Sequence, residues 1–260
     1  MGKSDFDKLI DRIKEKEELS GISSEAIGDL LRRYLRINKL DLEAMSNKDL
    51  EIIKKDIRSQ LRIYVGRFHK SSSLKIENLK ELDFSTLIKT HISTKERLES
   101  YEILLNILGK VNPKIILDLG CGLNPLIIAK EGIRYYAVDI NEADLKIVKK
   151  YFSLKRIEGE VLSKDIRKIE EADLPEADIC LILKVFDLID RKGHKGAERI
   201  LDTIRAPHFI ISFPTKTLSG KPMNHPQRGW IERLLTRKGW PFEIYKCKNE
   251  IFYLVKKLKE

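Results

Sequence analysis

Cysteine and long apolar runs are both scarce in this sequence of 260 residues. Its three cysteines, Cys121, Cys180 and Cys247, are odd in number and widely spaced, which excludes a disulfide framework and a Cys-rich zinc site. The longest apolar runs, such as residues 179–183 and 209–213, are far shorter than the ~20 residues that a membrane-spanning helix needs. The first residues also lack the apolar stretch of a secretory signal. We therefore expect a cytoplasmic protein with no membrane segment and no metal site.

Acidic residues are fewer than basic ones. The sequence has 50 Lys and Arg against 40 Asp and Glu, a formal net charge of +10, and 35% of its residues are charged. Most of the excess lies in residues 184–260, where 17 basic residues face 8 acidic ones. A second concentration, residues 54–80, has 8 basic and 2 acidic residues. Such stretches favour a polyanionic partner, although solvated helix faces have the same composition.

The first part of the chain has the apolar spacing of helices. Apolar residues recur at intervals of three and four in three segments between residues 5 and 65, and no strand alternation interrupts them. The loop-like run HKSSSLK, residues 69–75, separates this part from the rest of the chain. We therefore predict a helical extension over residues 1–90 and a second domain over residues 91–260. In the third helix the basic side chains are expected to share the outer face: Lys54, Lys55, Arg58, Arg62 and Arg67.

From residue 114 onward, strand-like and helix-like segments alternate. The apolar runs KIILDLG, YYAVDI, ICLILK and HFIISFP are separated by helical stretches such as residues 142–152 and 194–204. This alternation is typical of a parallel sheet with helices on both faces. A final pair of runs, FEIYKC and EIFYLVKK, predicts an antiparallel hairpin at a sheet edge. The fold class is thus expected to be α/β, a doubly wound, mostly parallel sheet with an antiparallel edge hairpin, preceded by an all-α domain.

The run KIILDLGCGLNP, residues 114–125, carries the clearest chemical signal. A strand ends at Asp118, Gly120 and Gly122 follow, and the next strand ends at Asp139. Glycines here let the backbone turn sharply beside a ligand, and the acidic residue can accept hydrogen bonds from ribose hydroxyls. The third glycine of a dinucleotide fingerprint is missing, and no GxxxxGK[ST] phosphate loop occurs, so NAD and ATP are disfavoured. The motif predicts a nucleoside-containing cofactor, with a tight turn that binds no ligand as the alternative.

The run DLGCG resembles the first motif of the Rossmann-like S-adenosylmethionine-dependent methyltransferases, and the strand that ends in Asp139 resembles their second. The resemblance implies a seven-stranded sheet and S-adenosylmethionine as the cofactor. It also implies that Asp165 accepts a hydrogen bond from the adenine amino group, the alternative being a residue that only begins a helix. The implied cofactor contacts in this part of the chain are Asp118, Gly120, Gly122, Asp139, Ile140, Asp165, Ile166, Leu183 and Lys184.

Sequence motifs of the enzymes that methylate several other acceptor atoms are missing. Residues 184–187 are KVFD, in place of the Asn/Asp-Pro-Pro-aromatic tetrad of enzymes that methylate exocyclic amino groups. Cys180 lies inside a strand and lacks the Pro-Cys or Thr-Cys context of a nucleophile, and the five histidines pair with no plausible carboxylate. Guanine N7 has a free lone pair and no proton, so its methylation needs only orientation and desolvation. We therefore expect no catalytic acid or base, with Lys184 as the one candidate near the reacting atoms.

Further runs resemble one family in particular, the aminoglycoside-resistance methyltransferases of small-subunit (16S) ribosomal RNA, which modify a guanosine N7 in the decoding site. These runs are HISTKERL at residues 91–98, DLGCGLNPL at 118–126, YAVDI, LILK, and FIISFPTKTLSGK at 209–221. The resemblance covers about residues 90–257. It implies that Arg97 binds the cofactor carboxylate, the alternative being a surface pair with Glu99 or Glu102.

The two basic stretches are expected to hold RNA: charge alone indicates this for residues 54–67, and the same resemblance implies it for residues 216–228. The expected RNA contacts are Lys54, Lys55, Arg58, Arg62, Arg67, Lys216, Ser219, Lys221 and Arg228. A solvated charged surface is the alternative for these residues, and an ammonium that reaches solvent is the alternative for Lys184. The expected partner is the small ribosomal subunit, bound by a monomer. The alternatives are a methyltransferase acting on another structured RNA and a non-catalytic RNA-binding or assembly factor that retains the fold.

Overall fold

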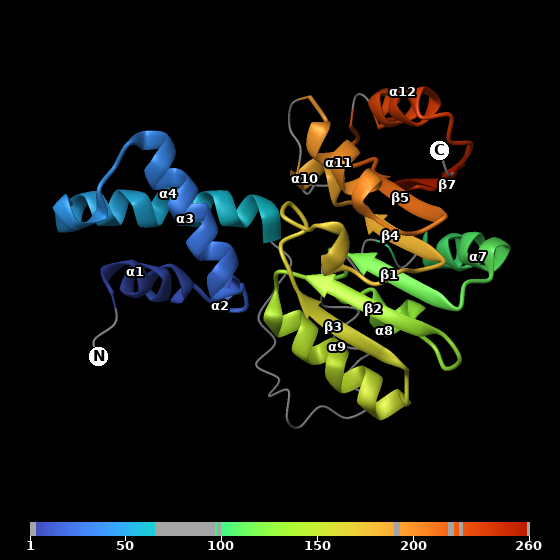
Figure 1. Ribbon diagram of the computed structural model, residues 1–260, viewed down its shortest axis with the longest axis horizontal. Helices are drawn as coiled ribbons and strands as arrows, with labels where there is room; N and C mark the ends of the chain where they lie inside the picture. Colours follow the sequence, from blue (N-terminus) through green and yellow to red (C-terminus); the bar gives the residue numbers. More distant parts are fainter. Residues whose placement is uncertain are drawn as a thin grey trace.

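The chain forms a helical body before residue 66 and an α/β body after residue 100, as the computed structural model shows (Figure 1). The structure describes residues 4–65, 97, 100–189, 193–217, 221–223 and 226–258. The predicted domain boundary between residues 90 and 91 lies outside these ranges. Each described body has its own hydrophobic core, as expected of separate domains.

The helical domain, residues 4–65, has one core. Its elements are α1 (Asp5–Lys14), α2 (Glu17–Ser20), α3 (Ser24–Asn38), the 3₁₀ turn η1 (Leu42–Ala44) and α4 (Asn47–Val65). Ser23 caps α3, because its hydroxyl accepts a hydrogen bond from the N–H of Ala26. The apolar stripes of the helices meet inside, where Ile13, Ile27 and Ile57 are fully buried. The all-α character predicted for this part of the chain is confirmed for the described residues.

The second domain is built on a seven-stranded sheet with the strand order β3-β2-β1-β4-β5-β7-β6. The strands are β1 (Ile115–Leu119), β2 (Arg134–Asp139), β3 (Gly159–Ser163), β4 (Ile179–Leu183), β5 (His208–Pro214), β6 (Phe242–Lys246) and β7 (Glu250–Lys256). The first five strands run parallel, and β7 runs antiparallel to both β5 and β6. The predicted mostly parallel sheet with an antiparallel hairpin at its edge is confirmed.

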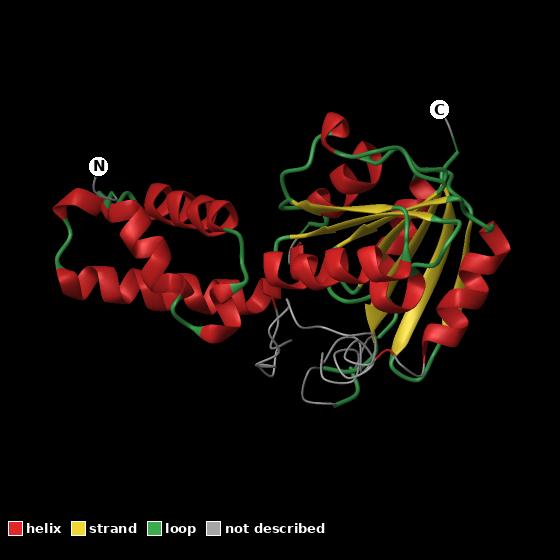
Figure 2. Cartoon of the chain, turned by 90° about the horizontal axis from the view of Figure 1, so that it is seen from below, coloured by secondary structure: helices red, strands yellow, loops and turns green. Residues whose placement is uncertain are grey.

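Helices cover both faces of this sheet (Figure 2). The described ones are α7 (Tyr101–Val111), α8 (Pro125–Ile128), α9 (Glu142–Lys155), α10 (Phe186–Ile189), α11 (Lys195–Thr203) and α12 (Gly229–Arg237), with a 3₁₀ turn η4 (Glu171–Asp173). On β1, Ile116 belongs to the core shared with α7, α8 and α9, whereas Leu117 belongs to the core shared with α11 and α12. Burial of the central strands β1, β4 and β5 on both faces explains why they are continuous apolar runs in the sequence.

The order of the strands reverses between β1 and β4, which are neighbours in the sheet. In doubly wound sheets, ligands bind outside the carboxyl ends of the strands at this point. The arrowheads of β1 and β2 point toward the helical domain (Figure 1), so that domain lies on the ligand-binding side of the sheet. Among the described helices, none has both the length and the apolar character needed to cross a membrane.

Candidate functional site

The loop after β1 makes a turn that requires glycine. Gly120 has a φ of +68° and Gly122 a φ of +48°, in the left-handed region that side chains disfavour. The N–H of Gly120 donates to the C=O of Val138 at 2.8 Å, which ties the loop to β2. A Cβ at position 120 would lie only 2.7 Å from a methyl carbon of Val185. The predicted glycine turn is therefore present, and it lies against the end of β2.

Asp139, the last residue of β2, holds the glycine loop in place. Its two carboxylate oxygens accept hydrogen bonds from the N–H groups of Gly122 and Asn141, each at 2.9 Å. Desolvation by the surrounding protein, together with the nearby charge of Asp144, raises the pKa of Asp139 above its ordinary value. Each carboxylate oxygen has a second lone pair, so the group can also accept from ribose hydroxyls. The next residue, Ile140, packs against the core of the helical domain.

Asp118 is fully buried in β1, directly before the glycine loop. The hydroxyl of Tyr135 donates to its Oδ2 at 2.7 Å, and its Oδ1 has no hydrogen-bond partner among the described residues. Burial raises the pKa of Asp118 to about 7. A cationic group of a ligand at Oδ1 would stabilise the ionised form, so this oxygen is suited to an ammonium.

Arg97 is also buried, with 1% of its surface exposed. Its Nε donates to both oxygens of Glu250, at 3.1 and 3.0 Å, and its Nη1 donates to the side-chain oxygen of Asn124. Although burial opposes the charge, the Glu250 carboxylate raises the pKa of Arg97 above its ordinary value. The charge of Arg97 in turn lowers the pKa of Asp118, against the larger effect of burial. The alternative of a surface pair is wrong, and Nη2, which has no partner among the described residues, is suited to a carboxylate.

Lys184 follows β4 in a left-handed conformation, with a φ of +61°. Its N–H donates to the C=O and to the hydroxyl of Ser212 on β5, each at 3.1 Å. Its Nζ lies 3.4 Å from Oε2 of Glu250, and only 12% of its side chain is exposed. The alternative of an ammonium that reaches solvent is therefore wrong. The preceding residue, Leu183, is buried. Lys184 and Arg97 therefore both contact the carboxylate of Glu250, at the edge of the sheet where the parallel strands end.

Asp165, in the loop after β3, faces Arg167. The guanidinium of Arg167 donates from Nε to Oδ1 at 2.8 Å and from Nη2 to Oδ2 at 2.5 Å. Ile166 packs against the core shared with α11 and α12. Contact between Asp165 and an adenine amino group stays a prediction, and it requires Arg167 to share or leave the carboxylate.

Glu250 is the residue of this site that sequence patterns miss. It is the first residue of β7, is fully buried and contacts both Arg97 and Lys184. The one available signal is a carboxylate at the start of the otherwise apolar run EIFYLV. That signal is weak, because an acidic side chain at the end of a strand is usually exposed to solvent.

The helical domain contacts the loops that follow β2, β3 and β4. After β2, Asn141 forms a short antiparallel bridge with Ile22. After β3, Lys168 forms an ion pair with Asp29 of α3. After β4, α10 packs against α4. Since these loops and the strand ends before them carry six of the ten predicted cofactor residues, the helical domain helps to fix the shape of the site.

Replacing Gly21 by alanine is expected to open the bridge after β2. The N–H of Ser23 donates to the C=O of Ile140 at 2.9 Å, and the N–H of Glu142 donates to the C=O of Gly21 at 2.7 Å. An added Cβ would lie 2.7 Å from the Cβ of Ala143, and such overpacking costs about 1–3 kcal/mol. Hydrogen exchange of the Ser23 and Glu142 amides should become about 10-fold faster, since about 1.4 kcal/mol of local stability corresponds to that factor.

Gly109→Ala on α7 is the matched control, because no atom lies within 4 Å of a Cβ at that position. It should leave the exchange of both amides unchanged. Unchanged exchange in Gly21→Ala as well would mean that the bridge tolerates the added methyl group, against the close approach at this position.

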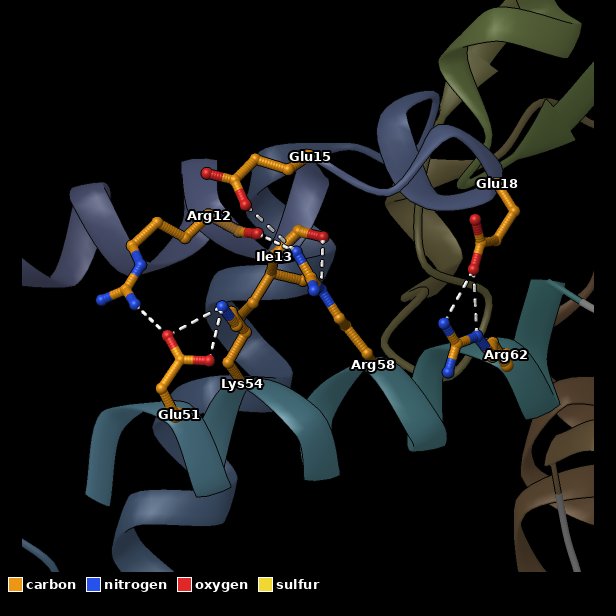
Figure 3. A network of polar contacts seen from close by, with 8 residues as sticks. All are labelled: Arg12, Ile13, Glu15, Glu18, Glu51, Lys54, Arg58 and Arg62. Atoms are coloured by element: carbon orange, nitrogen blue, oxygen red, sulfur yellow. Dashed lines mark hydrogen bonds and ion pairs between the residues drawn. The ribbon is translucent and has the colours of Figure 1, made fainter. Parts of the chain in front are cut away.

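The basic residues of α4 do not share an outer face. Arg58 is only 9% exposed: its Nε donates to the C=O of Ile13 at 3.2 Å and its Nη2 to the C=O of Arg12 (Figure 3). Its predicted position on the outer face is wrong, because the last turn of α1 offers carbonyl groups that lack a partner within the helix. Arg62 is 43% exposed and donates twice to one oxygen of Glu18, at 3.1 and 2.8 Å. Both arginines therefore join α4 to the α1–α2 region.

Lys54 and Lys55, which are neighbours on α4, differ in exposure. Lys54 pairs with Glu51, which also pairs with Arg12 (Figure 3), whereas Lys55 is exposed. Arg67, the last of the predicted RNA contacts in this part of the chain, lies outside the described residues. Of the predicted RNA contacts in the described part of α4, Lys55 and Arg62 are thus the exposed ones.

The loop after β5 carries the remaining predicted RNA contacts. Lys221 is exposed and Lys216 is half-buried. Arg228 is 14% exposed and donates to both oxygens of Asp187 on α10, at 3.2 and 2.6 Å. Ser219 lies outside the described residues. Arg228 therefore fastens its segment to α10, and RNA contact by these residues stays a prediction.

The doubly wound sheet, its glycine turn and the strand-final Asp139 together define a Rossmann-like S-adenosylmethionine-dependent methyltransferase. The model of one family, described as "Ribosomal RNA methyltransferase (FmrO)", matches residues 79–254. This match covers more than half of the chain, and the chain belongs to that family.

Known relatives agree with this assignment. A protein of Frankia casuarinae named 16S rRNA (guanine(1405)-N(7))-methyltransferase is 29% identical over 183 residues, which are 66% of this chain and 63% of the relative. The match thus spans less than two thirds of that relative's length. A Serratia marcescens protein of the same name is 30% identical over 209 residues, which are 77% of this chain and 81% of the relative.

A solved structure shares the fold. It is described as 16S rRNA methyltransferase RmtF in complex with S-adenosyl-L-homocysteine, and it superposes with a TM-score of 0.76 over 99% of this chain and 100% of its own. The sequence identity is 19%, so this likeness concerns the fold.

Proposed function

We propose that this protein transfers the methyl group of S-adenosylmethionine to N7 of a guanosine in the 16S RNA of the small ribosomal subunit, as a monomer in the cytoplasm. The observation that carries the proposal is a pair of buried, oppositely charged groups. Nη2 of Arg97 and Oδ1 of Asp118 both lack a hydrogen-bond partner among the described residues. The amino-acid end of the cofactor carries a carboxylate and an ammonium, the groups that such a pair would bind. Family membership and the names of the two relatives support the acceptor.

In this proposal, each residue of the site binds a different part of the cofactor. Arg97 binds the carboxylate, Asp118 binds the ammonium, and Asp139 accepts hydrogen bonds from the ribose. The glycine loop has no side chains at positions 120 and 122, so its backbone can approach the cofactor closely. A Cβ at position 120 would also collide with Val185. When bound, S-adenosylmethionine supplies an electrophilic methyl group on a sulfonium. The chain contributes the orientation of the two reactants. Holding them in place can lower the activation barrier by about 7 kcal/mol or more.

The chemistry at N7 needs no base. The lone pair of N7 forms the new N–C bond while the C–S bond breaks and its electron pair stays on sulfur, so positive charge passes to the base and no proton moves. The cysteines are consistent with this route. Cys180 is fully buried in β4, and burial raises the pKa of its thiol well above the ordinary value, so it is not poised as a nucleophile. Lys184 is the charged side chain at the end of β4 and is proposed to face the acceptor.

Substrate RNA is held by basic side chains on both sides of the site. A base inside folded RNA must be exposed before it can react, and contacts with the surrounding phosphates offset that cost of a few kcal/mol. Lys55 and Lys221 are exposed, and Arg62 and Lys216 are partly so. We assign phosphate contacts to these four side chains and not to Arg58, which is buried. Recognition would then follow RNA shape more than sequence.

Incubation with a methyl-labelled cofactor tests the proposal. Small ribosomal subunits, free 16S RNA and transfer RNA are offered in parallel, and labelled sites are mapped as alkali-labile N7-methylguanosine. The expected result is one labelled guanosine in the 16S RNA of the subunit and none in transfer RNA. Label only in another RNA would show that the proposed 16S RNA substrate is wrong. No label in any RNA would favour a non-catalytic RNA-binding protein.

A further inference from the structure

A single buried carboxylate, that of Glu250, joins the charged cluster that contains Arg97 and Lys184. Glu250 is fully buried and accepts hydrogen bonds from Nε of Arg97, at 3.0 and 3.1 Å, and from the hydroxyl of Ser212. Its Oε2 also lies 3.4 Å from Nζ of Lys184. Segments that are as far as 153 residues apart in the chain therefore meet on one side chain.

The direction of β7 puts this carboxylate at the ligand-binding edge. β7 pairs antiparallel with β5, with Glu250 opposite Pro214 and Phe252 opposite Ser212. The first residue of β7 consequently lies where the parallel strand β5 ends. Ligands of doubly wound sheets bind outside this edge.

Two cations keep the buried carboxylate ionised. Burial acts to raise the pKa of Glu250, but Arg97 and Lys184 outweigh it and hold the pKa below its ordinary value. A buried charge is costly unless it is both paired and hydrogen-bonded, and Glu250 is both. Its removal would leave two buried cations without their common counter-charge.

The contacts of Arg97 fix the plane of its guanidinium. Nε is bound to Glu250, and Nη1 donates to the side-chain oxygen of Asn124, which also accepts from the hydroxyl of Tyr101. Because a guanidinium is planar and rigid, two anchored nitrogens determine where the third one points. That third nitrogen, Nη2, has no partner among the described residues.

We propose that Glu250 is a positioning residue that aims Nη2 of Arg97 at the carboxylate of the cofactor and holds the ammonium of Lys184 beside the site. The inference rests on the proposed use of S-adenosylmethionine and assigns the residue that sets affinity for its amino-acid end. Since Glu250 acts through Arg97, its effect depends on whether the ligand carries a carboxylate.

Two nucleosides test this dependence in the full chain. S-adenosylhomocysteine carries the amino-acid end, and methylthioadenosine lacks it. Glu250→Gln is expected to weaken binding of S-adenosylhomocysteine by about 10-fold or more, the size of a lost hydrogen bond to a charged group, and binding of methylthioadenosine by less than about 2-fold. Isothermal titration calorimetry measures both. Glu243→Gln on β6, which removes a carboxylate exposed to solvent beside Lys110, is the matched control and should change neither affinity.

Equal losses for the two nucleosides, or no loss for either, would overturn the positioning role. If Glu250→Gln does not fold, Glu250→Asp keeps the charge but shortens its reach to Arg97, and the same selective loss is expected. In an Arg97→Lys background, Glu250→Gln should add no further selectivity, and added selectivity would contradict an effect through Arg97. A wild-type chain that binds neither nucleoside would contradict the proposed cofactor itself, so the two failures are distinguishable.

Discussion

Replacing Arg58 by alanine is expected to lower the stability of the helical domain by about 2–4 kcal/mol, although the residue lies in a basic stretch that resembles a surface patch. The C=O groups of Arg12 and Ile13 would lose their common donor in the last turn of α1. A positive charge at the carboxyl end of α1 also interacts favourably with the helix dipole, and that contribution would be lost. Hydrogen exchange of the α1 amides, together with urea denaturation followed by circular dichroism, measures the loss.

Lys55→Ala is the matched control for this experiment. Lys55 lies on the same helix and is exposed, so its loss should change stability by no more than about 0.5 kcal/mol. Equal effects of the two substitutions would contradict the assigned role of Arg58. An Arg58→Ala protein of full stability that binds RNA poorly would return Arg58 to the RNA-binding surface.

Asp139→Asn is expected to weaken the binding of S-adenosylhomocysteine by about 10- to 100-fold, which corresponds to one or two hydrogen bonds to a charged acceptor. The carboxylate of Asp139 serves the N–H groups of Gly122 and Asn141 with separate oxygens. An asparagine has one acceptor oxygen, so one of these N–H groups would face an amide NH₂. The substitution therefore loosens the glycine loop and also removes the charge offered to the ribose. Isothermal titration calorimetry gives the affinity directly.

Glu160→Gln controls for the loss of one negative charge from the same sheet. Glu160 is exposed on β3, opposite Tyr136 of β2. Its substitution should leave the affinity unchanged. An Asp139→Asn protein that binds as tightly as the wild type would remove Asp139 from the cofactor site.

Local chemistry explains which parts of the site could be predicted from the sequence. The turn at Gly120 and Gly122 is imposed by positive φ angles within a few residues, and Asp139 meets it because the next parallel strand ends beside it. Such signals need no knowledge of distant contacts. The order of apolar runs likewise predicted the mostly parallel sheet, since the central strands β1, β4 and β5 are buried on both faces.

The missed features depend on long-range contacts. Lys55 and Arg58 have the same charge and lie on the same helix, yet one is exposed and the other reaches a carbonyl group 45 residues earlier in the chain. Composition cannot separate two such side chains, because long cations cover apolar surface as readily as they enter solvent. The role of Glu250 could not be predicted for a similar reason, since its partner Arg97 is 153 residues away in the sequence.

The antiparallel direction of β7 puts the hairpin turn before it at the edge of the sheet where β5 ends. The turn before β7 also binds the loop after β5, because the N–H and the hydroxyl of Thr215 donate to the C=O groups of Asn249 and Lys248, each at 3.0 Å. That loop continues to Lys216. A change of sequence in this one short turn can therefore affect both the Glu250 cluster and the loop that carries Lys216. Both segments would then shift together while the parallel strands keep their pairing.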